Sequence, residues 1–295
     1  METFEFRKSR EIGDVISGTF AFMRQNWKAL GKAMLVFIAP FALLAGAFIG
    51  LLQANMSMFN IENMGMSSAL SEIGAGVTLF MVFILAASVM SAGVVYQYIK
   101  LYMEKGGGDI STQEIWEAMK PNLIVYTGYL SVSFMAVFLG ILFCIIPGIY
   151  LLVPLSMLIA VKTFEERSLG DAMSRCFFLV KNYWWQTFLT LFVINLIVGV
   201  AGQIASFPSM MLTVAMGLTT ASDGGNPDVT FKILLTVASA FSYGISSLLG
   251  VVTIVGIALQ YFSLVERKEG KGAMQRIDSL GEVKEANDND FAETY

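Results

Sequence analysis

The sequence contains no histidine and only two cysteines among its 295 residues. Histidine is the commonest general base in enzymes and the commonest protein ligand for metals, so its absence removes the usual starting point for both kinds of site. Two cysteines, Cys144 and Cys176, cannot build a disulfide framework, and we expect both to pack as small apolar residues. The sequence therefore predicts a protein that is not an enzyme, with no catalytic residue, no metal site and no cofactor.

Charged residues are scarce as well, at 14% of the chain against 56% apolar residues. Roughly a quarter of the residues in an ordinary soluble domain are charged, and a water-soluble fold cannot bury so much apolar surface. Several runs reach about 20 apolar residues, the length that crosses a hydrocarbon core roughly 30 Å thick. Because these runs are apolar on every face, they indicate helices rather than the alternating strands of a barrel. The fold class is therefore predicted as an all-α polytopic membrane protein.

Six transmembrane helices are predicted, and the segments between some of them are read as turns or loops. The predicted spans are 33–52, 77–98, 123–146, 149–164 and 184–202, with a sixth that lies within 231–265 and has its core at 243–262. Pro147 and Gly148 are expected to form the tight turn between the third and fourth spans, and the Met-rich segments 53–76 and 203–228 are expected to be external loops. Four glycines are predicted to let helices approach closely. They are Gly46, Gly50, Gly244 and Gly250, and the ridge through Gly46 suits packing within the chain or dimerisation.

Three amphipathic helices are predicted to lie in the plane of the lipid headgroups, at about 9–28, 111–120 and 168–180. In the second, Ile115 and Met119 belong to the face expected to contact lipid. Ser111 with Glu114 fits a capping box, and Ser168 is expected to cap the third helix. A further short surface helix is expected around Met274, Ile277 and Leu280.

The distribution of positive charge predicts which side of the membrane each segment occupies. With these boundaries, and with Lys162 counted with the span exit that it adjoins, 18 of the 19 Lys and Arg residues fall on one side, and only Lys232 falls on the other. The positive-inside rule then places both termini and the three amphipathic helices in the cytoplasm. All four tryptophans fall at the same boundary. The predicted interfacial anchors are Trp27, Trp116, Trp184, Trp185, Arg24, Lys120 and Lys181.

Short similarities suggest an internal threefold repeat with units 9–105, 111–167 and 168–267 inside a transmembrane domain of residues 1–265, followed by a charged cytoplasmic tail, 266–295. Each unit would contain a surface helix, two spans and an acid-base exit such as Glu104-Lys105, Glu166-Arg167 or Glu266-Arg267. Similar physics at every membrane boundary would produce the same short motifs by chance, so both explanations stay open at the level of sequence.

Segments 146–150, 165–168 and 180–184, with Ala172 and Arg175 between the last two, resemble a family of bacterial six-span membrane proteins. That family is similar to the membrane domain fused to some glycerophosphodiester phosphodiesterases. The resemblance extends over most of residues 1–282 and implies a membrane module. The phosphodiesterase catalytic domain, with its histidine pair and metal-binding carboxylates, has no counterpart here, so no catalytic residue can be carried over.

These observations favour a scaffold or accessory subunit of a membrane complex, with another membrane protein and anionic lipid headgroups as partners and no nucleic acid. The alternative is a carrier or flippase for a lipid or a small neutral solute, with a path near Pro40, Pro154 and Asn195. No charged residue falls in the middle of a predicted span, which disfavours an ion-coupled carrier. An enzyme that acts on a lipid headgroup is a third reading, since only Glu, Asp and Tyr near the interface could serve it.

Overall fold

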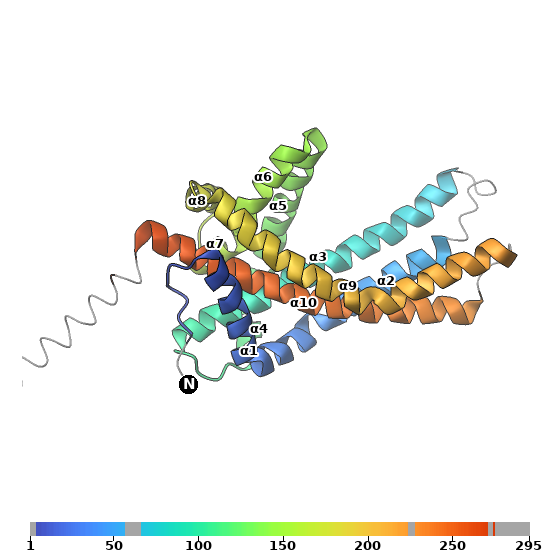
Figure 1. Ribbon diagram of the computed structural model, residues 1–295, viewed down its shortest axis with the longest axis horizontal. Helices are drawn as coiled ribbons and strands as arrows, with labels where there is room; N and C mark the ends of the chain where they lie inside the picture. Colours follow the sequence, from blue (N-terminus) through green and yellow to red (C-terminus); the bar gives the residue numbers. More distant parts are fainter. Residues whose placement is uncertain (1–3, 57–65, 224–227, 271–273, 275–295) are drawn as a thin grey trace, which may run out of the picture.

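The computed structural model describes residues 4–56, 66–223, 228–270 and 274, and all regular structure in these residues is helical (Figure 1). The elements are α1 (Ile12–Phe37), α2 (Ala39–Met56), α3 (Met66–Glu104), α4 (Thr112–Met119), η1 (Lys120–Asn122), α5 (Leu123–Phe143), α6 (Ile145–Leu155), α7 (Leu158–Glu165), α8 (Leu169–Val180), α9 (Trp184–Asp223) and α10 (Val229–Glu269).

Five helical stretches in the described residues are long and apolar enough to cross a membrane. They are Val77–Glu104, Thr112–Phe143, Ile145–Glu165, Trp184–Thr219 and Val229–Glu269. A sixth candidate is the pair α1 and α2, which is bent by 52° at its break. The predicted class, an all-helical chain with several apolar helices suited to a polytopic membrane protein, is confirmed at this level.

The helices are organised around α10 (Figure 1). Both α2 and α9 pack along α10, and α1, α3, α7 and α8 also contact it. The short helices α4, α7 and α8 gather with α1 at one end of the molecule, which we call the base, while α5 and α6 form a hairpin that diverges from the α2–α9–α10 group. The largest buried cluster includes Phe22, Tyr96, Ile115, Leu179 and Phe262, so the main core lies in the base.

The first predicted boundary is wrong. A single helix, α1, joins the predicted surface helix to the start of the first predicted span, and the break comes at Ile38 rather than near Lys28. Pro40 explains its position: a proline has no N–H to bond the carbonyl four residues earlier and is tolerated in the first turn of a helix, which is where Pro40 lies in α2.

The turn predicted at Pro147 and Gly148 is also misplaced. The chain reverses at Cys144, which is extended with φ −169° and ψ 141°, and α6 starts at Ile145. Pro147 therefore lies in the first turn of α6, where its missing N–H removes no helical hydrogen bond. The fourth span is longer than predicted, 21 residues from Ile145 to Glu165, with a break after Pro154.

The two Met-rich segments predicted as loops are largely helical. Helix α2 continues to Met56 and α3 begins at Met66, while residues 57–65 lie outside the described residues. Helix α9 continues to Asp223 through Pro208, and α10 extends to Glu269, so it includes the first residues of the predicted tail. Met, Ala and Leu are strong helix formers, and helix propensity here overrides the lack of amphipathic periodicity. Of the surface helix expected beyond α10, only Met274 is among the described residues.

The short helices do not present their apolar faces as predicted. Ile115 and Met119 of α4 are fully buried in the protein core, and the Met119 side chain lies where a Cβ on Gly93 of α3 would stand. The capping box of Ser111 and Glu114 is confirmed, as is the Ser168 cap of α8. The correction follows from amphipathicity itself, because an apolar stripe indicates burial without specifying whether lipid or protein covers it.

Candidate functional site

The predicted close-packing glycines divide into three that contact another helix and one that does not. Cβ atoms built on Gly46 and Gly50 of α2 would lie 2.7 Å from the Cα atoms of Ala240 and Thr236 in α10, so the two backbones touch. Gly244 of α10 faces a Leu43 side-chain carbon at 3.0 Å. Gly250 has no such neighbour within 4 Å, so the prediction for that residue is wrong.

Gly148, predicted as a turn residue, instead sits at a helix crossing. A Cβ there would stand 2.3 Å from Ile141 Cγ1 and 2.7 Å from the Ile141 backbone nitrogen, and the position opposite is Gly140. The α5–α6 hairpin is therefore closed by two facing glycines, an arrangement that side chains of any size would force apart.

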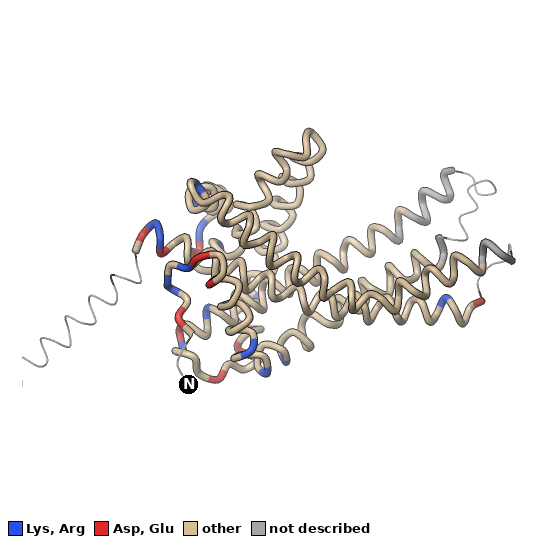
Figure 2. Tube along the Cα trace, in the orientation of Figure 1, with Lys and Arg blue, Asp and Glu red and all other residues tan. Residues whose placement is uncertain are grey.

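The predicted interfacial anchors lie at the base, at the starts of α5 and α9 and along α1, α4 and α8. Trp27 and Trp185 are 63% and 70% exposed, whereas Trp116 stacks on Phe37, and Trp184 stacks on Tyr150 and donates from Nε1 to its carbonyl oxygen. Arg24, Lys120 and Lys181 are exposed. In Figure 2 most of the Lys and Arg positions lie at this end of the trace, whereas the start of α10, which holds Lys232, lies at the other end.

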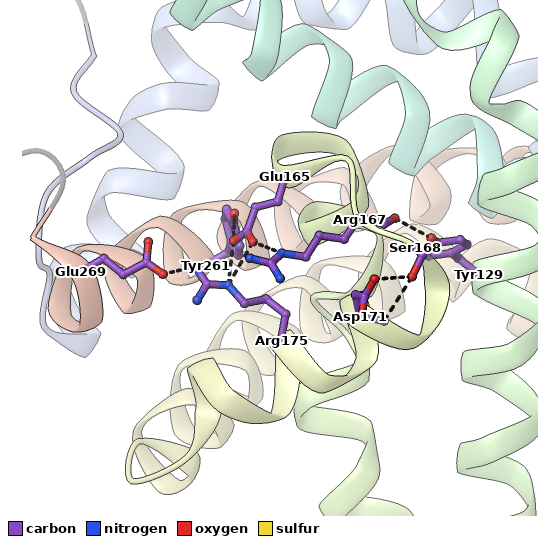
Figure 3. Close-up of polar contacts among 8 residues, drawn as sticks. All are labelled: Tyr129, Glu165, Arg167, Ser168, Asp171, Arg175, Tyr261 and Glu269. Atoms are coloured by element: carbon purple, nitrogen blue, oxygen red, sulfur yellow. Dashed lines mark hydrogen bonds and ion pairs between the residues drawn. The ribbon is translucent and has the colours of Figure 1, made fainter.

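The strongest cluster of charged side chains joins the ends of α7, α8 and α10 (Figure 3). Arg175 of α8 donates from Nε to both carboxylate oxygens of Glu165 at 3.0 Å, and its Nη2 pairs with Glu269. Glu165 also accepts from Tyr261 Oη at 2.9 Å and from Arg167 Nε at 2.6 Å. One carboxylate thus receives three side chains from three segments of the chain.

Burial decides which of these pairs is structural. The Arg175 side chain is 9% exposed and that of Glu165 13%, while Arg167 is 43% exposed. Burial by itself lowers the pKa of the Arg175 guanidinium, but hydrogen bonds to Glu269 and Glu165 more than offset it, so the pKa is raised. Arg175 therefore stays charged, and removing it would leave two carboxylates in a poorly hydrated place.

Hydrogen bonds beside this cluster fix the chain between α7 and α8. Glu166 ends α7 in the left-handed region at φ 55°, and its carboxylate pairs with Lys100 of α3 at 2.9 Å. The hydrogen bond from Lys100 lowers the pKa of Glu166. Tyr129 Oη of α5 donates to the carbonyl oxygen of Arg167, and Ser168 starts α8 (Figure 3). The base is tied together at the residues that follow the fourth span.

Two buried amide side chains extend the polar connections into the helices. Gln97 of α3 donates from Nε2 to Tyr126 Oη at 2.9 Å, and that hydroxyl lies 2.9 Å from Thr163 Oγ1 of α7. Gln260 of α10 donates to Thr187 Oγ1 of α9 at 3.1 Å. These bonds cross between helices, so they select which helices pair at the base.

The chemistry that this arrangement supports is limited. Arg167 and Arg175 both form ion pairs with the Glu165 carboxylate. In the described ranges, no three His, Cys, Asp or Glu residues lie close enough together to hold a metal ion. Cys176 is buried, and burial raises the pKa of its thiol to about 12. A thiol of that pKa is almost entirely protonated at neutral pH, so it is a poor nucleophile.

Sequence reasoning missed the partners of Glu165. Both Glu165, in segment 165–168, and Arg175 entered the sequence analysis through the family resemblance, and they were not paired with each other. One signal was available: Ala172, Cys176 and Leu179 define a buried face of α8, and Arg175 falls on that face. A charged residue on an apolar stripe indicates a buried ion pair. Nothing local in the sequence indicates that Tyr261 and Glu269, almost one hundred residues later, complete the cluster.

A groove of about 510 Å³ runs along the outer face of α9 and is lined by residues of α9 alone. Its lining includes Asn195, Gly199 and Gln203, one helical turn apart. Asn195 is exposed, and its Nδ2 donates to the carbonyl oxygen of Leu191. Neither Pro40 nor Pro154, which the sequence suggested as parts of a path with Asn195, lines this groove.

No family model, no curated protein and no solved structure matches the chain. The resemblance to the membrane domain of glycerophosphodiester phosphodiesterases therefore stays a prediction.

Proposed function

We propose that the protein is a non-enzymatic scaffold or accessory subunit of a bacterial inner-membrane complex, and that the α5–α6 hairpin is where it holds another membrane protein. Its termini and its base would lie in the cytoplasm. The proposal rests on one observation. Helices α5 and α6 pack closely against each other, but the rest of the protein leaves their other sides uncovered.

The hairpin contacts the rest of the protein mainly through its ends. Tyr126 and Tyr129 at the start of α5 are buried in the base, but beyond them both helices expose large apolar side chains on several sides. Phe134, Phe138 and Ile146 are 65%, 51% and 77% exposed. The contact at Gly140 and Gly148 holds the two helices together without help from another element. A preformed pair of apolar helices is a suitable docking surface for helices of a partner in the membrane.

Native co-purification in a gentle detergent, followed by mass spectrometry, tests the proposal. We expect a membrane protein to be recovered in stoichiometric amount with the wild-type chain, and F138A to lose it. F192A is the matched control, because Phe192 on α9 is 54% exposed and stacks on Phe188 one turn earlier, as Phe138 stacks on Phe134. Failure to recover a stoichiometric partner, or equal loss with F192A, would overturn the proposal.

A carrier or flippase for a lipid or small neutral solute is the second candidate, and the α9 groove favours it. Asn195 lies about 15 Å along α9 from Trp185 at 1.5 Å per residue, which is near the middle of a hydrocarbon core about 30 Å thick. An exposed amide at that depth is costly in lipid and suits a polar path. Flux of a fluorescent phospholipid in liposomes that N195L abolishes, with the fold intact, would support this candidate over the scaffold.

We also propose that the three units are an internal repeat. Their elements follow the same order: a surface-helix segment, which is the first part of α1 in the first unit and α4 and α8 in the others, is followed by two apolar stretches. Asn26 and Asn122 occupy corresponding junctions, and both donate from Nδ2 to the carbonyl oxygen four residues earlier. The last helix of each unit is followed by a residue with positive φ, at Gly106, Glu166 and Gly270. A duplicated ancestor would explain why these details recur.

A further inference from the structure

Cationic and aromatic side chains alternate where α8 meets the end of α10. The Phe178 ring lies between two cations, with Arg175 Cζ at 5.6 Å and Lys268 Nζ at 5.1 Å from its centroid. The Tyr183 ring lies between Lys268 Nζ at 5.6 Å and Arg267 Cζ at 5.4 Å. All five side chains thus form one ladder of three cations and two rings, and we refer to it as the cation ladder.

The charge along the cation ladder is balanced at one end only. Arg175 pairs with Glu165 and Glu269, but neither Lys268 nor Arg267 has a carboxylate within ion-pair distance among the described residues. Arg267 uses its two terminal nitrogens on Gln186 Oε1 and on the carbonyl oxygen of Arg10, and its Nε is buried without an acceptor. Two cations therefore share one tyrosine ring, and no carboxylate among the described residues neutralises them.

Cation–π contacts hold a cation in place while leaving its charge available to an anion. Two neighbouring cations with free charge are the usual recognition elements for a phosphate group, and a lysine binds it as a point charge. From this geometry we infer that Lys268 and Arg267 form a binding site for the phosphate of an anionic phospholipid. Lys181, exposed two residues before Tyr183, is the third basic residue of the same segment.

The surroundings favour a lipid over free phosphate. Tyr183 is followed directly by Trp184 and Trp185, and Trp185 is 70% exposed. Tryptophans are enriched at the level of the headgroups, and α9, one of the candidate spans, starts at Trp184. Phe178 is half exposed and continues the apolar surface beside Lys268. An anion that brings its own acyl chains would cover these rings, which inorganic phosphate cannot do. This inference does not depend on the scaffold proposal.

Native mass spectrometry of the full chain in detergent tests the site, with phosphatidylglycerol, phosphatidylcholine or inorganic phosphate added in separate titrations. We expect preferential retention of phosphatidylglycerol by the wild type, and K268Q to weaken it about five-fold, the effect of one basic residue at a membrane surface. K268R retains the charge and the ring contacts, so it should restore binding. The control is K28Q, which removes an exposed lysine from the same end of the molecule.

Two outcomes would overturn the site, and a third would overturn the assignment to a lipid. Equal retention of phosphatidylglycerol and phosphatidylcholine by the wild type would overturn the site, as would an equal loss with K28Q. Competition by inorganic phosphate as effective as that by phosphatidylglycerol would show a free-phosphate site and overturn the lipid assignment. Thermal unfolding of K268Q and K268R in the same detergent checks the fold, and rescue by K268R separates lost charge from lost structure.

Discussion

Helices α10 and α5 both belong to stretches apolar enough to cross a membrane, but they differ greatly in how much of each is buried inside the protein. In the most apolar part of α10, 61% of the residues are buried, against 11% for the stretch that contains α5. Helix α10 contacts six other helices, whereas α5 contacts mainly α6, α3 and α7. Hydropathy therefore identifies membrane helices without saying which of them is central.

The difference comes from polar and small residues. Gln260 and Ser263 of α10 are fully buried and hydrogen bonded to α9 and to the backbone of Arg10. The glycines of α2 let α10 approach to backbone contact. In α5 the buried hydroxyls belong to Tyr126 and Tyr129 near its start, and the rest of the helix exposes mainly apolar side chains. Position in the bundle is thus decided by a few polar contacts together with the close packing that the α2 glycines allow.

The two cysteines offer the sharpest contrast between the base and the hairpin. Cys144, exposed at the hairpin turn, should react with a membrane-impermeant maleimide added outside intact cells. Cys176 should not react even in permeabilised cells, because burial raises the pKa of its thiol to about 12 and shields it. Mass-shift assays on C144S and C176S measure each site separately. Labelling of Cys144 only after permeabilisation would reverse the predicted orientation.

Replacing the buried arginine of the base should have the largest effect on stability. R175L leaves Glu165 and Glu269 without their common partner, and breaking a buried ion pair typically costs about 3 kcal/mol or more. R167L removes an exposed arginine from the same carboxylate and should cost less than about 1 kcal/mol. Thermal unfolding in detergent compares the two. Equal losses would mean that burial of Arg175 contributes nothing.

A methyl group placed between α2 and α10 should destabilise the centre of the bundle. G46A puts a Cβ 2.7 Å from Ala240 Cα and from Tyr243 Cβ, so the helices must separate, at a cost of about 1 to 3 kcal/mol. G250A meets no other atom within 4 Å and should be neutral or raise stability by up to about 1 kcal/mol through helix propensity. Changes of the same sign in unfolding temperature would contradict the assigned packing.

The smallest effect is expected at the capping box of α4. S111A removes the side chain that accepts from the backbone N–H of Glu114, and loss of an N-cap typically costs about 1 kcal/mol. S133A on α5 is the control, because its hydroxyl bonds a carbonyl of its own helix that is already satisfied. Hydrogen exchange at residues 112–119 should rise for S111A alone. Unchanged exchange there would mean that packing of Ile115 and Met119 fixes the helix.

Features that depend on residues close together in the sequence were predicted correctly. The Ser111–Glu114 capping box and the Ser168 cap were predicted from spacing, and the apolar helices from run length. The prediction of loops at 53–76 and 203–228 was wrong, because Met, Ala and Leu favour helix even without amphipathic periodicity. The cluster around Glu165 could not be found, because its members are brought together only when α7, α8 and α10 pack.

The unbroken length of α10 has a mechanical consequence. At 41 residues it measures about 60 Å with a rise of 1.5 Å per residue, which exceeds the roughly 40–45 Å of a bilayer with its headgroups. No proline interrupts it, so in a bilayer α10 would be one unbroken rod, long enough for its two ends to reach the headgroups on opposite sides.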